Sequence, residues 1–271
     1  MNPRATHFPG FRGAALFALA YLYIPIIVLV VYAFNAGSTI AVWQGLSLKW
    51  FHNVFNDDNI QRAAVNSLVV ATIATLIATT VAMLAVVARR PDRSAGHGTS
   101  AMVINLPLMV PEVVTAVASL AFFIAIGLPL GLTTLIVAHT VFCIPFAYLP
   151  IQSSYQLLDP TLETAARDLY ASPRDAFWKV TLPLMAPGIA SGALLAFIIS
   201  LDDFVISAMV SGAGSTTLPV HIYGMVRHGA TPEINAISTL LLAVSILLVV
   251  ASHYLGGIRR TKGSQETTTE E

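Results

Sequence analysis

The sequence predicts an all-α integral membrane protein with six spanning helices. Of its 271 residues, 56% are apolar and only 10% are charged, whereas soluble domains carry roughly 25% charged residues. Six apolar runs are long enough to cross a bilayer, which takes about 20 residues in a helix. Lysine and arginine are also distributed unevenly between the loops that join these runs.

The six runs lie at about 14–34, 63–88, 100–126, 133–151, 184–209 and 234–257. The first run is too long for a secretory signal, whose apolar core has roughly 7–15 residues, so we expect a retained span. Of the 14 lysines and arginines, only Lys49, Arg62 and Arg227 fall on the side opposite the N-terminus, which leaves eleven on its own side. Positive charge collects in cytoplasmic loops, so both termini are predicted to be cytoplasmic.

Three segments follow from this pattern. Residues 1–61 hold the first span and an outer loop, in which Trp43 and Trp50 are expected to be interfacial anchors. Residues 62–257 form the five-helix core, and the polar tail 258–271 is predicted to be disordered. The candidate functional residues all lie within residues 62–257.

The inner loop at about 155–183 is neither apolar enough to span nor polar enough to be a plain linker. Asp159 followed by Pro160 predicts a helix start, with a capping carboxylate and proline at the first position. Apolar residues at a helical spacing then form a narrow stripe, namely Leu162, Ala165, Ala166 and Leu169. This first helix is expected at about 160–171.

A second short helix is predicted after it, capped by Ser172 with Asp175 at the reciprocal position and closed by Pro183. Two capped helices joined by a turn are typical of a docking element. An amphipathic loop lying on lipid headgroups fits the same pattern.

This loop resembles the signature loop of type I ABC importer permeases, Glu-Ala-Ala-x3-Gly-x9-Ile-x-Leu-Pro. Ala165, Ala166, Val180, Leu182 and Pro183 match the pattern. Thr164 stands at the glutamate position, with Glu163 just before it, and Tyr170 replaces the glycine. The resemblance implies that the loop couples to an ATPase, through Glu163, Thr164, Ala165, Ala166, Asp168, Leu169, Tyr170, Leu182 and Pro183.

Further stretches are similar to polyamine importer permeases of the putrescine and spermidine type: "NSL" at 66–68, "LPLMVPEV" at 106–113 and "SLDDFVISAMVSG" at 200–212. The resemblance implies a multi-pass bacterial inner-membrane protein with the type I importer permease fold. Its implied partners are two ATPase subunits, a second permease expected to be a paralogue, a periplasmic solute-binding protein and the lipid membrane, without nucleic acid.

No catalytic activity or cofactor is expected of the chain itself. The phosphate-binding pattern Gly-x4-Gly-Lys-Ser/Thr is absent from the sequence, so ATP would be bound by the partner subunit. No metal site is expected either. Within the importer class an amino-acid derivative, iron or a phosphonate stays possible as cargo. A proton-coupled secondary transporter and an intramembrane enzyme are the competing classes.

Three acids stand inside apolar runs. Asp202 and Asp203 are adjacent, so a helix would point them about 100° apart and at most one could face a pathway directly. Glu112 follows Pro107 and Pro111, which predict a kinked or broken helix. Acids in a membrane are functional candidates by default. These three could line a cation pathway, or could mark a span end and pair structurally.

Two smaller signals concern packing. Gly188, Gly192 and Ala196 form a small-residue face at four-residue spacing, suited to close helix contact either within the chain or with a partner permease. His139, in the fourth run, is expected to be a hydrogen-bonded interior histidine.

Overall fold

The computed structural model describes residues 11–39, 42–88, 97–229 and 231–262. These residues are almost entirely helical, and the only β pairing among them is an isolated bridge between Asn35 and Leu46. The helices are α1 (Phe11–Ala33), α2 (Lys49–Asn56), α3 (Asp58–Ala88), α4 (His97–Met109), α5 (Glu112–Ala125), α6 (Leu132–Gln156), α7 (Pro160–Asp168), α8 (Pro173–Ala176), α9 (Leu182–Asp202), α10 (Val205–Val210), α11 (Leu218–His228) and α12 (Pro232–Lys262).

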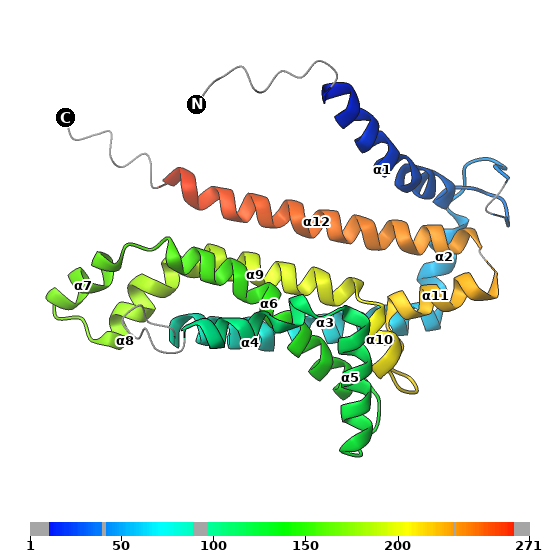
Figure 1. The fold of residues 1–271 in the computed structure, drawn as a ribbon. Helices are drawn as coiled ribbons and strands as arrows, with labels where there is room; N and C mark the ends of the chain where they lie inside the picture. The colour runs from blue at the N-terminus through cyan, green and yellow to red at the C-terminus, as the bar shows by residue number, and fades with distance from the viewer. Residues whose placement is uncertain (1–10, 40–41, 89–96, 230, 263–271) are drawn as a thin grey trace. The chain divides into compact units, whose positions relative to one another are not determined.

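Five helices in the described part of the chain are long and apolar enough to cross a membrane (Figure 1). A sixth span is present only if α4 and α5 are counted together as one broken span, because the chain bends by 116° between them. Pro107 lies inside α4 and Pro111 immediately precedes α5. Proline removes a backbone donor and clashes with the preceding turn, so the predicted break in the third run is confirmed.

The chain divides into two compact units, residues Met1–Gln61 with Ile222–Val244 and residues Arg62–His221 with Ser245–Glu271. In the first unit, the loop after α1 is organised by Asn35. Its side chain donates to the carbonyls of Thr39 and Val42 and accepts from the amide of Gln44. The Trp50 indole donates to the Asn35 carbonyl at 2.9 Å.

This arrangement corrects the expectation for Trp50. The side chain is only 8% exposed, so it forms the core of the loop and is no interfacial anchor. A buried indole N–H needs an acceptor, and the carbonyls of Asn35 and Gly37 supply it. Trp43 is 42% exposed and packs edge-on against Tyr32.

In the second unit, α6 and α9 run side by side (Figure 1). A continuous apolar cluster joins them to α3, α5 and α10, with fully buried members that include Val70, Leu135, Tyr148, Met185 and Ile206. Helix α10 packs against both α5 and α6. Helix α5, which is the second half of the broken span, and the C-terminal end of α9 therefore belong to the same packed core.

The small-residue face of α9 lies against α6. A Cβ atom on Gly192 would lie 2.5 Å from the carbonyl oxygen of Ala147, and one on Gly188 would overlap Ser154. Ala196 is fully buried, and its carbonyl accepts from the Cys143 thiol at 3.5 Å. The sequence left open whether this face contacts a helix of the same chain or a partner permease. In the structure, it contacts α6 of the same chain.

Several predicted boundaries are wrong. The run 184–209 is not one helix, because α9 ends at Asp202 and α10 begins at Val205. Pro183 does not close the second short helix: α8 continues through a π-helical turn (Phe177–Thr181) into α9, where Pro183 is in the first turn. The π-helical turn just before it shifts the backbone hydrogen bonds, with the Leu182 amide donating to the Phe177 carbonyl, and so accommodates the proline within a continuing helix.

At the other end, α12 continues through residues 258–262, which were predicted to be disordered; the rest of the tail lies outside the described residues.

Candidate functional site

The loop between α6 and α9 begins with the predicted cap. The Asp159 carboxylate accepts from the backbone amide of Thr161 at 2.9 Å, and Pro160 is the first residue of α7. This hydrogen bond holds the pKa of Asp159 below its usual value, because the amide stabilises the ionised form. The start of α7 is thus encoded by two adjacent residues, as the sequence predicted.

Helix α7 ends at Asp168, earlier than the predicted end at about residue 171, in a reversal centred on Tyr170. The amide of Tyr170 donates to the Arg167 carbonyl at 3.0 Å, and the amide of Ala171 donates to the Ala166 carbonyl at 3.1 Å. This pair of bonds defines a Schellman motif, whose C′ residue is left-handed and usually glycine. Tyr170 has φ 62° and is the only non-glycine residue with positive φ in the described chain.

The second short helix is also capped as predicted. The Ser172 hydroxyl accepts from the Asp175 amide at 3.1 Å and donates to the Asp175 carboxylate at 2.5 Å. Lys179 lies 2.7 Å from the same carboxylate. The ammonium group, together with the hydroxyl of Ser172, lowers the pKa of Asp175. The starts of α7 and α8 are therefore both fixed by side chains of the loop itself.

Helix α7 packs on α8 and the π-helical turn, yet several large apolar side chains of this segment stay exposed. Leu162 is 44% exposed, Leu169 82%, Tyr170 99% and Trp178 64%. Ala166 is half-buried, whereas Ala165 and Thr164 are exposed. The predicted stripe of α7 is thus largely available for a partner.

The other residues that match the signature loop lie in two places, in α7 and at the start of α9. Glu163 is in the first turn of α7 and is half-buried, and Asp168 is its last residue. Leu182 and Pro183 belong to α9. The loop residues are therefore brought together on one short segment, except for the last two, which begin the long helix that follows.

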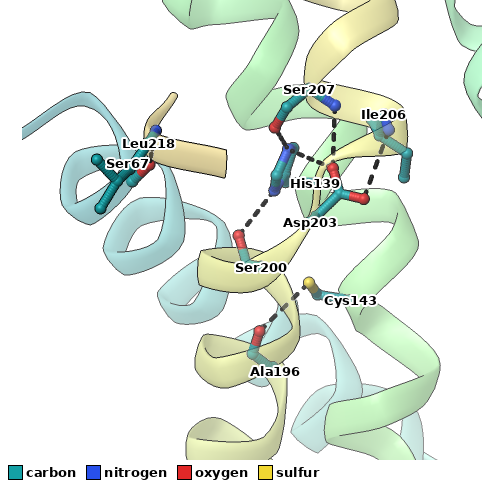
Figure 2. A network of polar contacts seen from close by, with 9 residues as sticks. All are labelled: Ser67, His139, Cys143, Ala196, Ser200, Asp203, Ile206, Ser207 and Leu218. Atoms are coloured by element: carbon teal, nitrogen blue, oxygen red, sulfur yellow. Dashed lines mark hydrogen bonds and ion pairs between the residues drawn. The ribbon is translucent and has the colours of Figure 1, made fainter. Parts of the chain in front are cut away.

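The adjacent acids at the end of α9 point in different directions. Asp203 is 6% exposed, and its carboxylate accepts from the amides of Ser207 at 2.9 Å and Ile206 at 3.4 Å (Figure 2). Those amides belong to the first turn of α10, where backbone N–H groups have no carbonyl within the helix to donate to. Asp202 is exposed. A single step along the chain thus separates a buried capping carboxylate from an exposed one.

His139 of α6 connects the ends of α9 and α10. Its Nδ1 lies 2.8 Å from the Ser200 hydroxyl, and its Nε2 lies 3.0 Å from the Ser207 hydroxyl and 3.4 Å from the Asp203 carboxylate (Figure 2). The carboxylate beside Nε2 favours the tautomer with the proton on that nitrogen, so that Nδ1 accepts from Ser200. The prediction of a hydrogen-bonded interior histidine is confirmed. We call His139, Ser200, Asp203 and Ser207 the His139 clamp.

Glu112 meets this cluster from α5. It is the first residue of that helix and is half-buried, and its carboxyl lies close enough to Asp203 and His139 to interact with them electrostatically. The structure therefore brings Glu112 and Asp203 together and leaves Asp202 apart from them.

Sequence reasoning missed Ser200 and Ser207, and it gave Asn66 no role. The Asn66 amide donates to the carbonyls of Gly214 and Thr216, and the Ser67 hydroxyl accepts from the Leu218 amide at 2.7 Å (Figure 2). These bonds tie the start of α3 to the loop after α10. The polar "NS" pair at the start of a long apolar run was the available signal.

A multi-span helical protein that carries a capped loop between two of its spans, and buried acids at the ends of others, has the architecture of a transport permease. Residues 85–258 match the family described as "Binding-protein-dependent transport system inner membrane component". The chain belongs to this family, whose members are membrane components of transport systems that work with a binding protein.

Relatives and solved structures agree with that assignment. The chain is 39% identical to the spermidine/putrescine transport system permease protein PotC of Haemophilus influenzae, over 90% of this chain and 95% of that protein. It is 42% identical to the putrescine transport system permease protein PotI of Escherichia coli (strain K12), over 87% of each.

Among solved structures, the fold is similar to a bacterial ABC transporter that imports the acidic polysaccharide alginate, with a TM-score of 0.68, 15% identity and coverage of 94% of this chain and 98% of that one. It is also similar to the MetNI methionine ABC transporter, with a TM-score of 0.61, 20% identity and coverage of 74% and 98%.

The protein is therefore a membrane-embedded permease of a binding-protein-dependent transport system and not an enzyme, and its fold is that of ABC importer permeases. In the described residues, no group of three or more His, Cys, Asp or Glu side chains is arranged to hold a metal ion.

Proposed function

We propose that this chain is one of two permease subunits of a polyamine importer of the bacterial inner membrane, driven by two separate ATPase subunits and supplied by a periplasmic binding protein. The observation that supports this proposal most strongly is the capped loop 155–183 between two spans, which exposes the side chains of Leu162, Leu169 and Tyr170. Exposed apolar side chains of this kind mark an interaction surface, and we assign this one to the ATPase. The second permease is proposed to be a paralogue.

The proposed orientation places this loop and both termini in the cytoplasm. The support is the excess of lysine and arginine on that side of the predicted spans. An ATPase works on the cytoplasmic side, where ATP is present, so the orientation and the docking role agree. The outer loops would then face the binding protein.

The proposed cargo is a putrescine-like or spermidine-like cation. The relatives PotC and PotI are named for spermidine and putrescine transport. Asp202, Asp203 and Glu112 supply carboxylates at the ends of broken spans. Since carboxylates near a route offset part of the hydration that a multivalent ammonium ion loses, acids here favour cations over neutral or anionic solutes.

Cargo is tested by uptake. The complete transport system, with its own ATPase, second permease and binding protein, is expressed in cells that lack polyamine importers, and uptake of labelled spermidine and putrescine is measured. We expect uptake that excess unlabelled polyamine abolishes. Uptake of an amino-acid derivative, iron or a phosphonate, with no polyamine uptake, would contradict the cargo assignment while leaving the permease class intact.

Docking is tested by a charge on the exposed stripe. Leu169→Asp should reduce co-purification of the ATPase and polyamine uptake by at least tenfold, because an unpaired carboxylate would be buried against the partner. The matched control is Leu46→Asp in the outer loop, since Leu46 is 81% exposed and Leu169 is 82% exposed. Equal uptake and equal ATPase recovery in both variants would contradict docking through α7.

A proton-coupled secondary transporter would use the same acids as proton sites. It predicts uptake that follows the proton gradient and survives removal of the ATPase. It assigns no role to the capped loop, whose two helices are fixed by Asp159, Ser172 and Asp175. The loop therefore favours the ATP-driven system.

A further inference from the structure

The turn that ends α7 contains a tyrosine where the backbone favours glycine. Tyr170 has a φ of 62°, and no other non-glycine residue of the described chain has a positive φ. A β-carbon crowds the backbone in this left-handed conformation, whereas glycine adopts it freely. The Schellman motif at this point therefore forms at a cost in free energy that glycine would avoid.

The side chain of Tyr170 does not offset this cost within the chain. It is 99% exposed, so it makes almost no contact with the rest of the described residues. Leu169, the residue before it, is 82% exposed as well. Strained backbone positions cluster at functional sites. We therefore expect the tyrosine ring to have its contact outside the chain.

The backbone on both sides of Tyr170 is held by hydrogen bonds. The amides of Tyr170 and Ala171 donate to carbonyls of α7 at 3.0 and 3.1 Å. The Ser172 hydroxyl then accepts from the Asp175 amide and caps α8. A tyrosine on a fixed backbone loses little conformational entropy when a partner encloses its ring. The turn thus presents the ring in a geometry suited to a shaped recess.

A protein partner accounts for this geometry better than a bilayer does. A lipid surface has no fixed shape, so a tyrosine at an unstrained neighbouring position would enter the headgroup region equally well. A recess in a protein is filled only by a side chain at the matching position. Tyr170 also directly follows Leu169, in the segment at one end of the α6–α9 pair (Figure 1) that we propose docks on the ATPase. The ring is therefore assigned to the ATPase.

We infer that Tyr170 determines which ATPase this permease accepts. Its ring occupies a recess of the cognate ATPase, and the same ring clashes with an ATPase whose surface is shaped for a glycine turn. The signature pattern has glycine at this position, so an ATPase that serves such a loop meets only backbone there. Specificity comes from such a clash as well as from a favourable contact. The inference rests on the proposed docking of α7 to an ATPase.

The experiment measures the affinity of the permease pair for two purified ATPases in detergent, without a bilayer and with the second permease unchanged. One ATPase is the cognate subunit, and the other serves an importer whose permeases have glycine at this position. Tyr170→Phe keeps the ring, Tyr170→Ala keeps only the β-carbon, and Tyr170→Gly removes both. For the cognate ATPase, Tyr170→Phe should bind within about threefold of the parent chain, whereas Tyr170→Ala and Tyr170→Gly should bind roughly tenfold more weakly or worse.

For the second ATPase the order should reverse, with Tyr170→Gly binding roughly tenfold more tightly than the parent chain. Amide hydrogen exchange of residues 160–176 separates binding from folding. Tyr170→Gly relieves the backbone strain, so exchange should slow in this variant while its affinity for the cognate ATPase falls. A residue with only a structural role would change loop stability and affinity in the same direction.

Equal affinity of the parent chain, Tyr170→Ala and Tyr170→Gly for the cognate ATPase would overturn the contact. Equal affinity of the parent chain and Tyr170→Gly for the second ATPase would overturn the discrimination. An effect of these variants that appears only in lipid nanodiscs would assign the ring to the bilayer, which also overturns the inference.

Leu169→Asp separates a failure of this inference from a failure of the proposed function. If Leu169→Asp loses the cognate ATPase while Tyr170→Ala keeps it, docking through α7 stands and the role of Tyr170 is wrong. If both variants bind the ATPase as the parent chain does, the docking and the role of Tyr170 are both wrong.

Discussion

Tyr170 illustrates how one residue can match a motif in geometry while departing from it in chemistry. The signature pattern has glycine at this position, and the chain adopts the left-handed conformation there with a tyrosine. The two Schellman hydrogen bonds around it are complete. A β-carbon in this conformation costs roughly 1–2 kcal/mol, so the loop keeps its geometry at a cost in local stability.

Tyr170→Gly should therefore stabilise the loop by about 0.5–1 kcal/mol, because the strain relief exceeds the extra chain entropy of glycine in the unfolded state. The measurement is amide hydrogen exchange of residues 160–176, which should slow. Tyr170→Ala is the control, since it removes the ring but keeps the β-carbon. Equal slowing in Tyr170→Ala would show that the ring, and not the backbone, is responsible.

Local signals at single residues were reliable in this loop. The caps at Asp159 and Ser172 were predicted because donor and acceptor lie within three residues of each other. The clamp was not predicted, because Ser200 is 61 residues from His139 and Ser207 is 68 residues from it. A spacing of that length gives no pattern in a single sequence. Trp50 was misassigned for a similar reason, since its partner Asn35 is 15 residues away.

At the scale of elements, the pair α6 and α9 depends on the absence of side chains at two positions. The backbone of α6 approaches α9 so closely that a β-carbon on Gly192 would lie 2.5 Å from a carbonyl oxygen. Backbone atoms cannot rotate away as a flexible side chain can. The small-residue spacing predicted a close helix contact, and the structure identifies α6 as its partner.

Gly192→Ala should destabilise the protein by about 1–3 kcal/mol, the usual cost of overpacking, and should lower the thermal unfolding temperature in detergent. Gly224→Ala in α11 is the matched control, since nothing lies within 4 Å of the added carbon there. It should be neutral or stabilising by up to about 1 kcal/mol. A Gly192→Ala variant as stable as the Gly224→Ala variant would contradict the close contact.

Apolar length predicted where most spanning helices lie, whereas their ends depended on polar residues. Helix α3 begins at Asp58, before its apolar run, because the Asp57 carboxylate accepts from the amides of Asn59 and Ile60. The break before α5 was visible in two prolines. The break after α9 was not, because it depends on a histidine of another helix.

At the scale of the whole molecule, the packed pair of α6 and α9 joins the two sites. The loop 157–172 connects the end of α6 to α8, and α8 continues through the π-helical turn into α9. The contacts from Ser154 and Gly188, through Cys143 and Ala196, to His139 and Ser200 then follow both helices to the acids. We therefore expect a force on the loop to reach Asp202 through this packed pair of helices.

The central claim is that the chain transmits work from a separate ATPase and supplies none itself. The most direct test is uptake by vesicles that contain the purified permease pair and the binding protein, with and without the ATPase subunits, at fixed proton gradient. Concentrative spermidine uptake should require both the ATPase subunits and ATP on the side of the membrane where those subunits are bound. Concentrative uptake by the permease pair alone would contradict the account.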